Sequence, residues 1–74
     1  MCTVKAIIFS CPPNEDYLEF RLIFDDGYEK YYKLDQYEIK AFRGENIRDI
    51  IEHHAKEYYE HICQPCETLK IIFF

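Results

Sequence analysis

The chain has few of the residues that build flexible loops and phosphate-binding turns. It contains no tryptophan, two glycines, three prolines and a single serine, Ser10, among 74 residues. Without a glycine-rich phosphate loop or a serine at a strand-to-helix elbow, it carries neither a nucleotide-binding motif nor a serine-hydrolase motif. So little glycine and proline also excludes a collagenous or low-complexity chain.

Long hydrophobic runs are missing too. The longest apolar stretches, Ala6–Phe9 and Ile71–Phe74, are far shorter than the roughly 20 residues that a membrane-spanning helix needs. Met1 to Ser10 holds one lysine inside an alternating segment, unlike the basic end, apolar run and cleavage site of a secretory signal. We therefore expect a cytoplasmic protein without membrane association, located in the host cytoplasm if its gene is viral.

Basic residues are outnumbered. Nine lysines and arginines stand against fourteen aspartates and glutamates, which gives a formal net charge of −5 at pH 7. A surface that binds nucleic-acid phosphates clusters lysine and arginine. The charge balance therefore predicts no direct contact with nucleic acid.

The residues that could catalyse a reaction form no recognisable constellation. Asp25 and Asp26 are adjacent carboxylates, but together with Gly27 they are typical of a tight turn. His54 and His61 would lie about 10.5 Å apart along a helix, too far to bind one ion together. We predict that the protein is not an enzyme and that it holds no cofactor, with zinc as the one alternative.

What the chain does contain is enough apolar material for one small core. Hydrophobic residues make up 49% of the chain and aromatic residues 18%, so residues 1–74 are expected to fold as a single domain. A domain of this length buries only about 60% of the surface of its unfolded chain. Such domains are often stabilised by a disulfide, a metal ion or a second subunit.

Alternating apolar residues predict four strands. The second strand has the clearest alternation, with leucine or phenylalanine at every second position from Leu18 to Phe24. Asp25-Asp26-Gly27 predicts a three-residue hairpin loop in which Gly27 takes the left-handed conformation. This loop would place Phe24, Phe20 and Leu18 opposite Tyr28, Tyr32 and Leu34. The strands are expected at Thr3–Ser10, Tyr17–Phe24, Tyr28–Leu34 and Leu69–Phe74.

One amphipathic helix is predicted from Ile47 to Ile62, with Asn46 as its N-cap. Its polar face, which includes the i,i+4 pair Glu52 and Lys56, is expected in solvent. We interpret Asp35–Arg43 as a connection. The arc that would face the sheet comprises Ile47, Ile50, Ile51, His54, Tyr58, His61 and Ile62.

The element order is therefore β-β-β-α-β, which indicates an α+β fold. Three strands run up, down and up, and the helix crosses back so that the fourth strand runs parallel to the first. We predict a four-stranded, mainly antiparallel sheet in the order 3-2-1-4, with the amphipathic helix packed on one face. In the alternative topology, the fourth strand lies beside the third.

In the order 3-2-1-4, three of the four cysteines fall at one end of the sheet. Cys2 begins the first strand and Cys66 precedes the fourth. Cys63 and His61 are close to Cys66 in the chain, whereas Cys11 lies at the far end, roughly 30 Å from Cys2. Two stabilising sites are open: zinc bound by Cys2, His61, Cys63 and Cys66, or a disulfide from Cys2 to Cys63 or Cys66. If the fourth strand lay beside the third, Cys2 would be far from Cys66 and neither site could form.

A thioredoxin-like redox pair is not expected. Cys63-x-x-Cys66 follows the C-terminal end of the predicted helix. The helix dipole at that end disfavours a thiolate, whereas redox cysteines sit at helix N-termini.

Seven tyrosines and six phenylalanines are too many for so small a core to enclose. Several of them fall on the predicted sheet face that points away from the helix, mixed with charged residues. An exposed patch of this kind is typical of protein contacts; the alternative is that the Asp35–Arg43 connection covers it. The expected interface residues are Phe9, Tyr17, Ile23, Tyr31, Ile72 and Phe74.

The sequence therefore favours a small, acidic, non-enzymatic protein-interaction module. Its partner would be another protein or a second copy of the chain in a homodimer. A narrower hypothesis is an inhibitor, encoded by a phage, a virus or another mobile element, that binds a basic surface of a nucleic-acid-binding protein. The alternative is a small zinc- or disulfide-stabilised domain with a structural Cys-x-x-Cys site.

Overall fold

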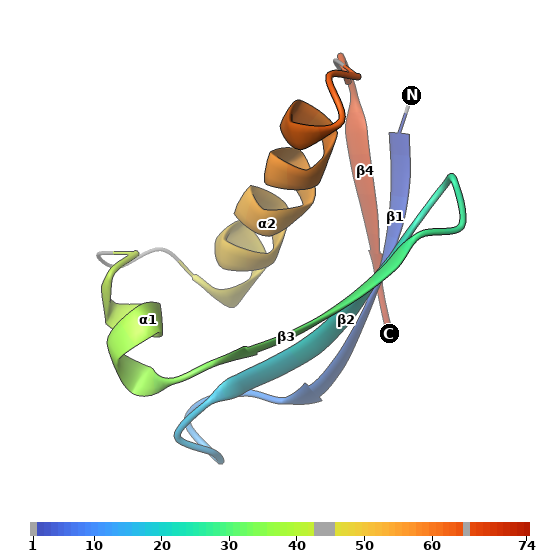
Figure 1. Ribbon diagram of the computed structural model, residues 1–74. Helices are drawn as coiled ribbons and strands as arrows, with labels where there is room; N and C mark the ends of the chain where they lie inside the picture. The colour runs from blue at the N-terminus through green and yellow to red at the C-terminus, as the bar shows by residue number, and fades with distance from the viewer. Residues whose placement is uncertain (1, 43–45, 65) are drawn as a thin grey trace.

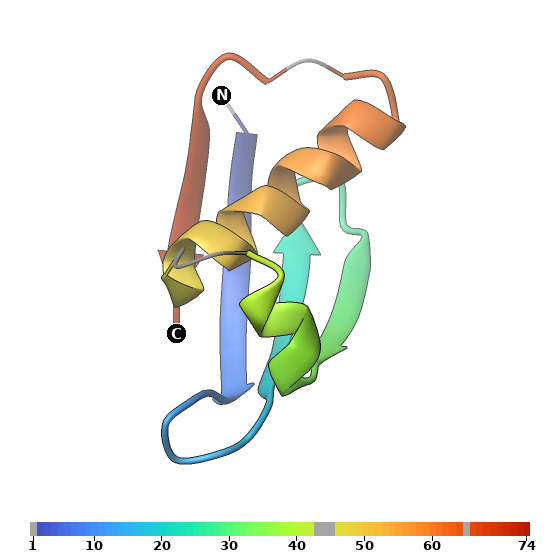
Figure 2. The ribbon, with the colours of Figure 1, turned by 90° about the vertical axis from the view of Figure 1, so that its left-hand side faces the viewer.

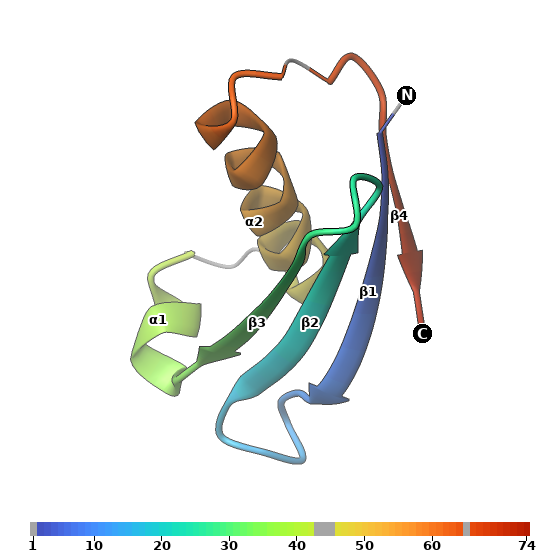
Figure 3. The ribbon, with the colours of Figure 1, turned by 45° about the vertical axis from the view of Figure 1, so that its right-hand side comes forward.

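A computed structural model describes residues 2–42, 46–64 and 66–74 of the chain. The elements follow the order βββααβ, and the strands form one four-stranded sheet ordered β3-β2-β1-β4 (Figure 1). The predicted α+β fold and strand order are confirmed, with β1 antiparallel to β2 and parallel to β4 (Figure 3). The elements are β1 (Cys2–Ser10), β2 (Leu18–Phe24), β3 (Glu29–Leu34), α1 (Gln36–Lys40), α2 (Ile47–His61) and β4 (Leu69–Phe73).

The hairpin between β2 and β3 has the predicted turn and register. Gly27 has a φ of 91°, in the left-handed region that favours glycine, and its N–H donates to the Phe24 carbonyl at 3.0 Å. The Phe24 N–H donates to the Tyr28 carbonyl at 2.8 Å, which closes the loop. Farther along, Phe20 lies opposite Tyr32, and their rings stack with centroids 4.9 Å apart.

Both ends of α2 are held by specific hydrogen bonds. At the start, the Asn46 side chain accepts from the Asp49 N–H at 2.9 Å, as a predicted N-cap should. At the end, the Cys63 N–H donates to the Glu60 carbonyl at 3.1 Å and the Gln64 N–H to the Tyr59 carbonyl at 3.0 Å. This is the Schellman pattern, and it stops the helix at His61, one residue earlier than predicted. Pro65, the sequence signal for the end, lies outside the described residues.

The face that α2 turns toward the sheet differs in part from the predicted arc. Its buried residues are Ile50, Ile51, Ala55 and Tyr59, whereas His61 is exposed. Ala55 is fully buried although its side chain is small, and the predicted arc, which follows the large apolar side chains, does not include it.

The connection after β3 contains a short helix that the sequence interpretation missed. In α1, the Asp35 side chain accepts from the Glu38 N–H at 2.8 Å, and the Glu38 carboxylate accepts from the Asp35 N–H at 3.3 Å. This reciprocal capping box forms one helical turn. Ile39 and Phe42 pack against the core, which places α1 on the same side of the sheet as α2 (Figure 2). Arg43, the last residue of the expected connection, is outside the described residues.

The hydrophobic core lies between the sheet and α2. It combines the inward residues of β1 and β2 with the buried face of the helix, and Phe20 is its largest fully buried side chain. No helix in the described part of the chain is long and apolar enough to span a membrane. The core residues are Val4, Ala6, Leu18, Phe20, Leu22, Phe24, Leu34, Ile50, Ile51, Ala55 and Tyr59.

Candidate interaction surface and disulfide

The sheet face opposite the helices carries the predicted interface residues. Strand register places Ile72, Lys5, Ile23 and Glu29 in one row across all four strands. The next row contains Ile7, Arg21 and Tyr31, and the Phe74 N–H extends the pairing by donating to the Ala6 carbonyl at 2.9 Å. Alternation along each strand therefore turns these side chains away from the core.

Large aromatic surfaces are exposed on this face, which is called the outer face below. Phe9 and Tyr31 are each 49% exposed and Phe74 is 68% exposed, whereas Tyr17, Ile23 and Ile72 are half-buried. Both helices lie on the other side of the sheet (Figures 1 and 3). The alternative in which the connection after Leu34 covers this face is therefore wrong for residues 35–42, because Ile39 and Phe42 pack against the core on the helix side.

Cations are interleaved with the aromatic rings of the outer face. The guanidinium of Arg21 lies 5.8 Å from the centre of the Phe9 ring, and Lys33 Nζ lies 4.4 Å from that of Tyr17. The Tyr31 hydroxyl donates a hydrogen bond to Glu19, which raises the pKa of Tyr31 above its usual value. On this face, Lys5, Arg21, Lys33 and Lys70 outnumber Glu19 and Glu29.

The helix side has the opposite charge balance. The helices α1 and α2 together contain five carboxylates and three cations. Among the described residues, the shortest ion pair joins Lys56 Nζ to Glu52 Oε1 at 3.1 Å. The cation excess of the outer face and the carboxylate excess of the helices cancel, so the net charge of −5 comes from the rest of the chain. The charged residues of the helices are Glu38, Asp49, Glu52, Glu57 and Glu60 against Lys40, Arg48 and Lys56.

The two aspartates of the hairpin loop join the hairpin to the last turns of α2. The Tyr58 hydroxyl donates to Asp26 at 2.5 Å, and the Tyr59 hydroxyl donates to Asp25 at 3.0 Å. The first bond lowers the pKa of Asp26 and raises the pKa of Tyr58 to about 12. Burial, followed by the bond to Asp25, raises the pKa of Tyr59 to about 12. These carboxylates therefore serve as hydrogen-bond acceptors between two elements.

His54 lies at the edge of the core, where its ring packs against aromatic neighbours. Its centroid is 4.7 Å from that of Tyr32 and 6.1 Å from that of Phe20. Burial lowers the pKa of His54, and the charge of His53 adds to this effect, whereas Glu57, 3.6 Å from Nδ1, opposes it. The imidazole is thus neutral at pH 7, and its buried Nε2 has no hydrogen-bond partner within the described residues.

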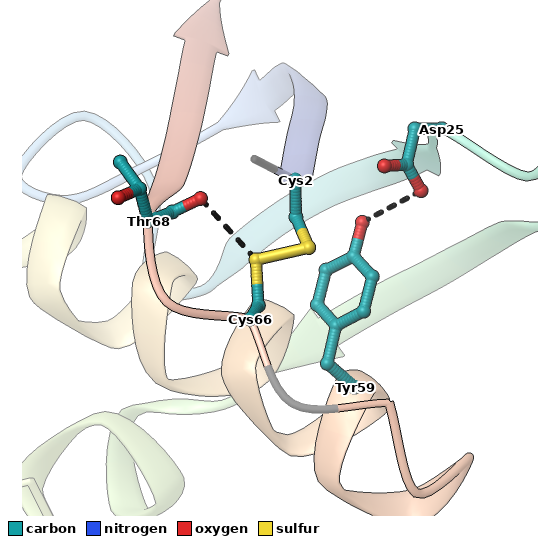
Figure 4. The surroundings of a disulfide bond; sticks show 5 residues. All are labelled: Cys2, Asp25, Tyr59, Cys66 and Thr68. Atoms are coloured by element: carbon teal, nitrogen blue, oxygen red, sulfur yellow. Dashed lines mark hydrogen bonds between the residues drawn. A yellow bond between two sulfur atoms is a disulfide. The ribbon is translucent and has the colours of Figure 1, made fainter.

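A disulfide joins Cys2 to Cys66, with Cα atoms 6.0 Å apart (Figure 4). The sequence left Cys63 and Cys66 open as partners of Cys2; Cys66 is the one used. The Cys2 N–H also donates to the Thr68 carbonyl at 2.9 Å. That carbonyl lies 3.2 Å from Cys66 Sγ, a contact only, since a disulfide sulfur has no hydrogen to donate.

The four residues considered as zinc ligands are not brought together. Cys2 and Cys66 are consumed in the disulfide, and Cys63 is an exposed free thiol. Cys63 and Cys66 line a hollow of about 720 Å³, whereas His61 lines a separate one with Tyr28 and Lys30. Within residues 2–42, 46–64 and 66–74, no group of three or more potential ligands gathers around a common point.

The charge separation between the two surfaces is the main feature that sequence reasoning missed. Its signal was visible, because Lys5 and Arg21 occupy outward positions in two alternating strands. Comparison of the chain with protein-family models, with curated proteins and with solved structures finds no match.

Proposed function

We propose that the protein is a small, non-enzymatic interaction module that binds another protein through the outer face of its sheet. The observation that carries this proposal is the exposure of Phe9, Tyr31 and Phe74 on a face that the described helices do not cover. Exposed aromatic side chains supply much of the binding energy in protein interfaces, because each removes a large apolar area from water.

The charges of this face indicate what kind of protein would bind there. Its cations exceed its carboxylates, so an apolar surface with an acidic rim would be complementary to it. Two copies docked face to face would oppose cation to cation, which disfavours a homodimer of that geometry. We therefore favour a different protein as the partner.

A second candidate is the inhibitor of a nucleic-acid-binding protein, of phage, viral or mobile-element origin. The acidic balance of α1 and α2 supports it, because a basic groove would attract that side of the molecule. This candidate uses a different surface from the first. A basic partner would meet Glu57 and Glu60 on α2, both of which are exposed, and would avoid the cations of the outer face.

Surface variants distinguish the two candidates. Phe9→Ser and Phe74→Ser alter the outer face, Glu57→Lys and Glu60→Lys alter the helix side, and Tyr37→Ser removes a 73% exposed aromatic ring from α1 as the matched control. For a partner isolated with the wild-type chain, we expect the phenylalanine variants to weaken binding at least about 10-fold. Tyr37→Ser and the lysine variants should bind within about 3-fold of wild type.

The opposite pattern, in which only the charge reversals weaken binding, would favour the inhibitor and reject the outer face. Sedimentation of the isolated chain tests the remaining arrangement. A dimer that dissociates on Phe74→Ser would identify a second copy as the occupant of the outer face, contrary to the charge argument.

A further inference from the structure

Three of the four cysteines gather at one end of the molecule, and only two of them are bonded to each other. Cys63 follows the C-cap of α2, and Cys66, three residues farther along the chain, forms the disulfide with Cys2. The free thiol of Cys63 and the bonded Cys66 line the same hollow. A free thiol and one cysteine of the disulfide therefore border the same solvent-accessible hollow.

We propose that Cys63 exchanges with this disulfide within the folded domain. The Cys63 thiolate attacks Cys66 Sγ, so that a Cys63–Cys66 bond forms while the Cys2–Cys66 bond breaks. Cys2 leaves as a thiolate and takes up a proton, which balances the proton that Cys63 lost. One disulfide replaces another, so the step needs no oxidant or reductant.

The chain between the two cysteines permits this attack. Cα atoms three residues apart are at most about 11 Å from each other even in a fully extended chain. A disulfide requires Cα atoms roughly 4.4–6.8 Å apart, which lies within that reach. Both cysteines lie outside regular secondary structure, since α2 ends at His61 and β4 begins at Leu69.

The backbone at Cys63 is consistent with a role for its thiol. Cys63 has a φ of 57° at the position after the helix where glycine is usual, because a side chain is strained there. Its backbone N–H and that of Gln64 are tied to the last turn of α2, which holds the exposed side chain at the end of the helix. Glycine would terminate the helix with less strain, but it would supply no sulfur.

The released Cys2 would remain in its strand. Its N–H donates to the Thr68 carbonyl at 2.9 Å, and its backbone pairs with Leu69 in the parallel ladder. Exchange therefore removes the covalent link between β1 and the segment before β4 while the hydrogen bonds remain. The thiol set free at Cys2 is then available to a reagent or to the thiol or disulfide of another protein.

Cys11 provides an internal control. It is the other free cysteine and lies past the far end of the nine-residue strand β1, about 30 Å from Cys2. It cannot reach the disulfide of its own molecule, but it could attack that of a second molecule. Loss of Cys63 should therefore abolish intramolecular exchange, and loss of Cys11 should not.

Peptide mapping tests the proposal. Protein oxidised with glutathione disulfide is incubated at pH 8 without reductant and then acidified to stop exchange. Free thiols are alkylated, and the chain is cleaved on the C-terminal side of lysine and glutamate residues. The original disulfide links the peptide 1–5 to the peptide 61–67, whereas the exchanged form gives an internally bonded 61–67 and an alkylated Cys2. In the wild type and in Cys11→Ser, we expect the exchanged form at about 1% or more of the protein, a typical minor-state population, with a rate independent of dilution.

Two variants lack the thiol, Cys63→Ser and Cys63→Gly, and neither should show alkylated Cys2 above background. The glycine variant is included because glycine fits the left-handed backbone at this position, so it should fold even if serine is poorly tolerated. Alkylation of Cys2 at wild-type levels in both variants would overturn the proposal. So would the absence of the exchanged form in the wild type, a rate that falls with dilution, or failure of glutathione disulfide to form the Cys2–Cys66 bond.

Discussion

Removal of the disulfide is the most informative change in stability that the structure predicts. Cys2 and Cys66 are 64 residues apart in the chain, so their bond closes a loop that contains almost the whole domain. In the chain-entropy description, closing a loop of this length removes about 14 cal/mol/K from the unfolded state, or about 4 kcal/mol at 25 °C. That is a large part of the stability expected for a small domain, commonly 5–15 kcal/mol in total.

The test compares Cys2→Ala/Cys66→Ala, which lacks the disulfide, with Cys11→Ala/Cys63→Ala, which keeps it and lacks both free thiols. We expect the first variant to lose about 4 kcal/mol of unfolding free energy, with a melting temperature roughly 16–32 °C lower. The second should remain within about 1 kcal/mol of wild type. Circular dichroism during thermal and urea unfolding measures both, and reduced wild type should match the first variant.

A different outcome would refute the reasoning. Suppose that the intact mass shows the disulfide in the wild type, and yet the unfolding free energy of the variant without it is within about 1 kcal/mol of the wild-type value. The disulfide would then not stabilise the domain by restricting the unfolded chain. An equal loss in the variant that keeps the disulfide would point to strain or packing at the substituted cysteines.

Three further predictions concern single side chains. Because burial lowers the pKa of His54, the unfolded chain binds a proton at this histidine at a higher pH than the folded chain does. The unfolding free energy should therefore be largest above pH 6.5 and should decrease as the pH is lowered below 6.5. The dependence of the urea midpoint on pH between 7.5 and 6 should become flatter in His54→Gln but not in His53→Gln. In Gly27→Ala the added methyl group would meet no atom within 4 Å, but the residue would keep a φ of 91°, which is unfavourable for alanine. The variant should therefore lose about 1–2 kcal/mol of unfolding free energy in thermal unfolding, and unchanged stability would contradict this reasoning. Phe20→Ala empties the centre of the core and should cost about 3–5 kcal/mol in urea, whereas a loss below about 1 kcal/mol would mean that the core collapses around it.

Local patterns account for the parts of the fold that were predicted correctly. The register of β2 and β3 depends on Gly27 and on a side-chain period of two, and both can be read within about 17 residues of chain. The start of α2 depends on Asn46 and the three residues that follow it. The helix α1 was missed because its apolar pattern also fits a strand, although its capping pair, Asp35 and Glu38, is visible in the sequence.

The buried face of α2 could be predicted only in part. Hydrophobicity identifies Ile50 and Ile51, but it does not show that Tyr59 is buried and His61 exposed. The Tyr59 hydroxyl donates a hydrogen bond to Asp25 in the distant hairpin, so the polar atom of this buried ring is satisfied. A polar group is buried where a partner satisfies it, and this partner is 34 residues away.

The sequence by itself determined which segments form the strands and the long helix, which side chains of the strands face the core, and which end of the sheet holds three cysteines. Each of these depends on neighbours in the chain or on a short list of allowed topologies. Only the tertiary structure decided that Cys66, and not Cys63, bonds to Cys2, and that the Tyr59 hydroxyl meets Asp25 of the distant hairpin. Both contacts depend on distances between atoms far apart in the chain, and those distances exist only after the sheet and the helix have packed together.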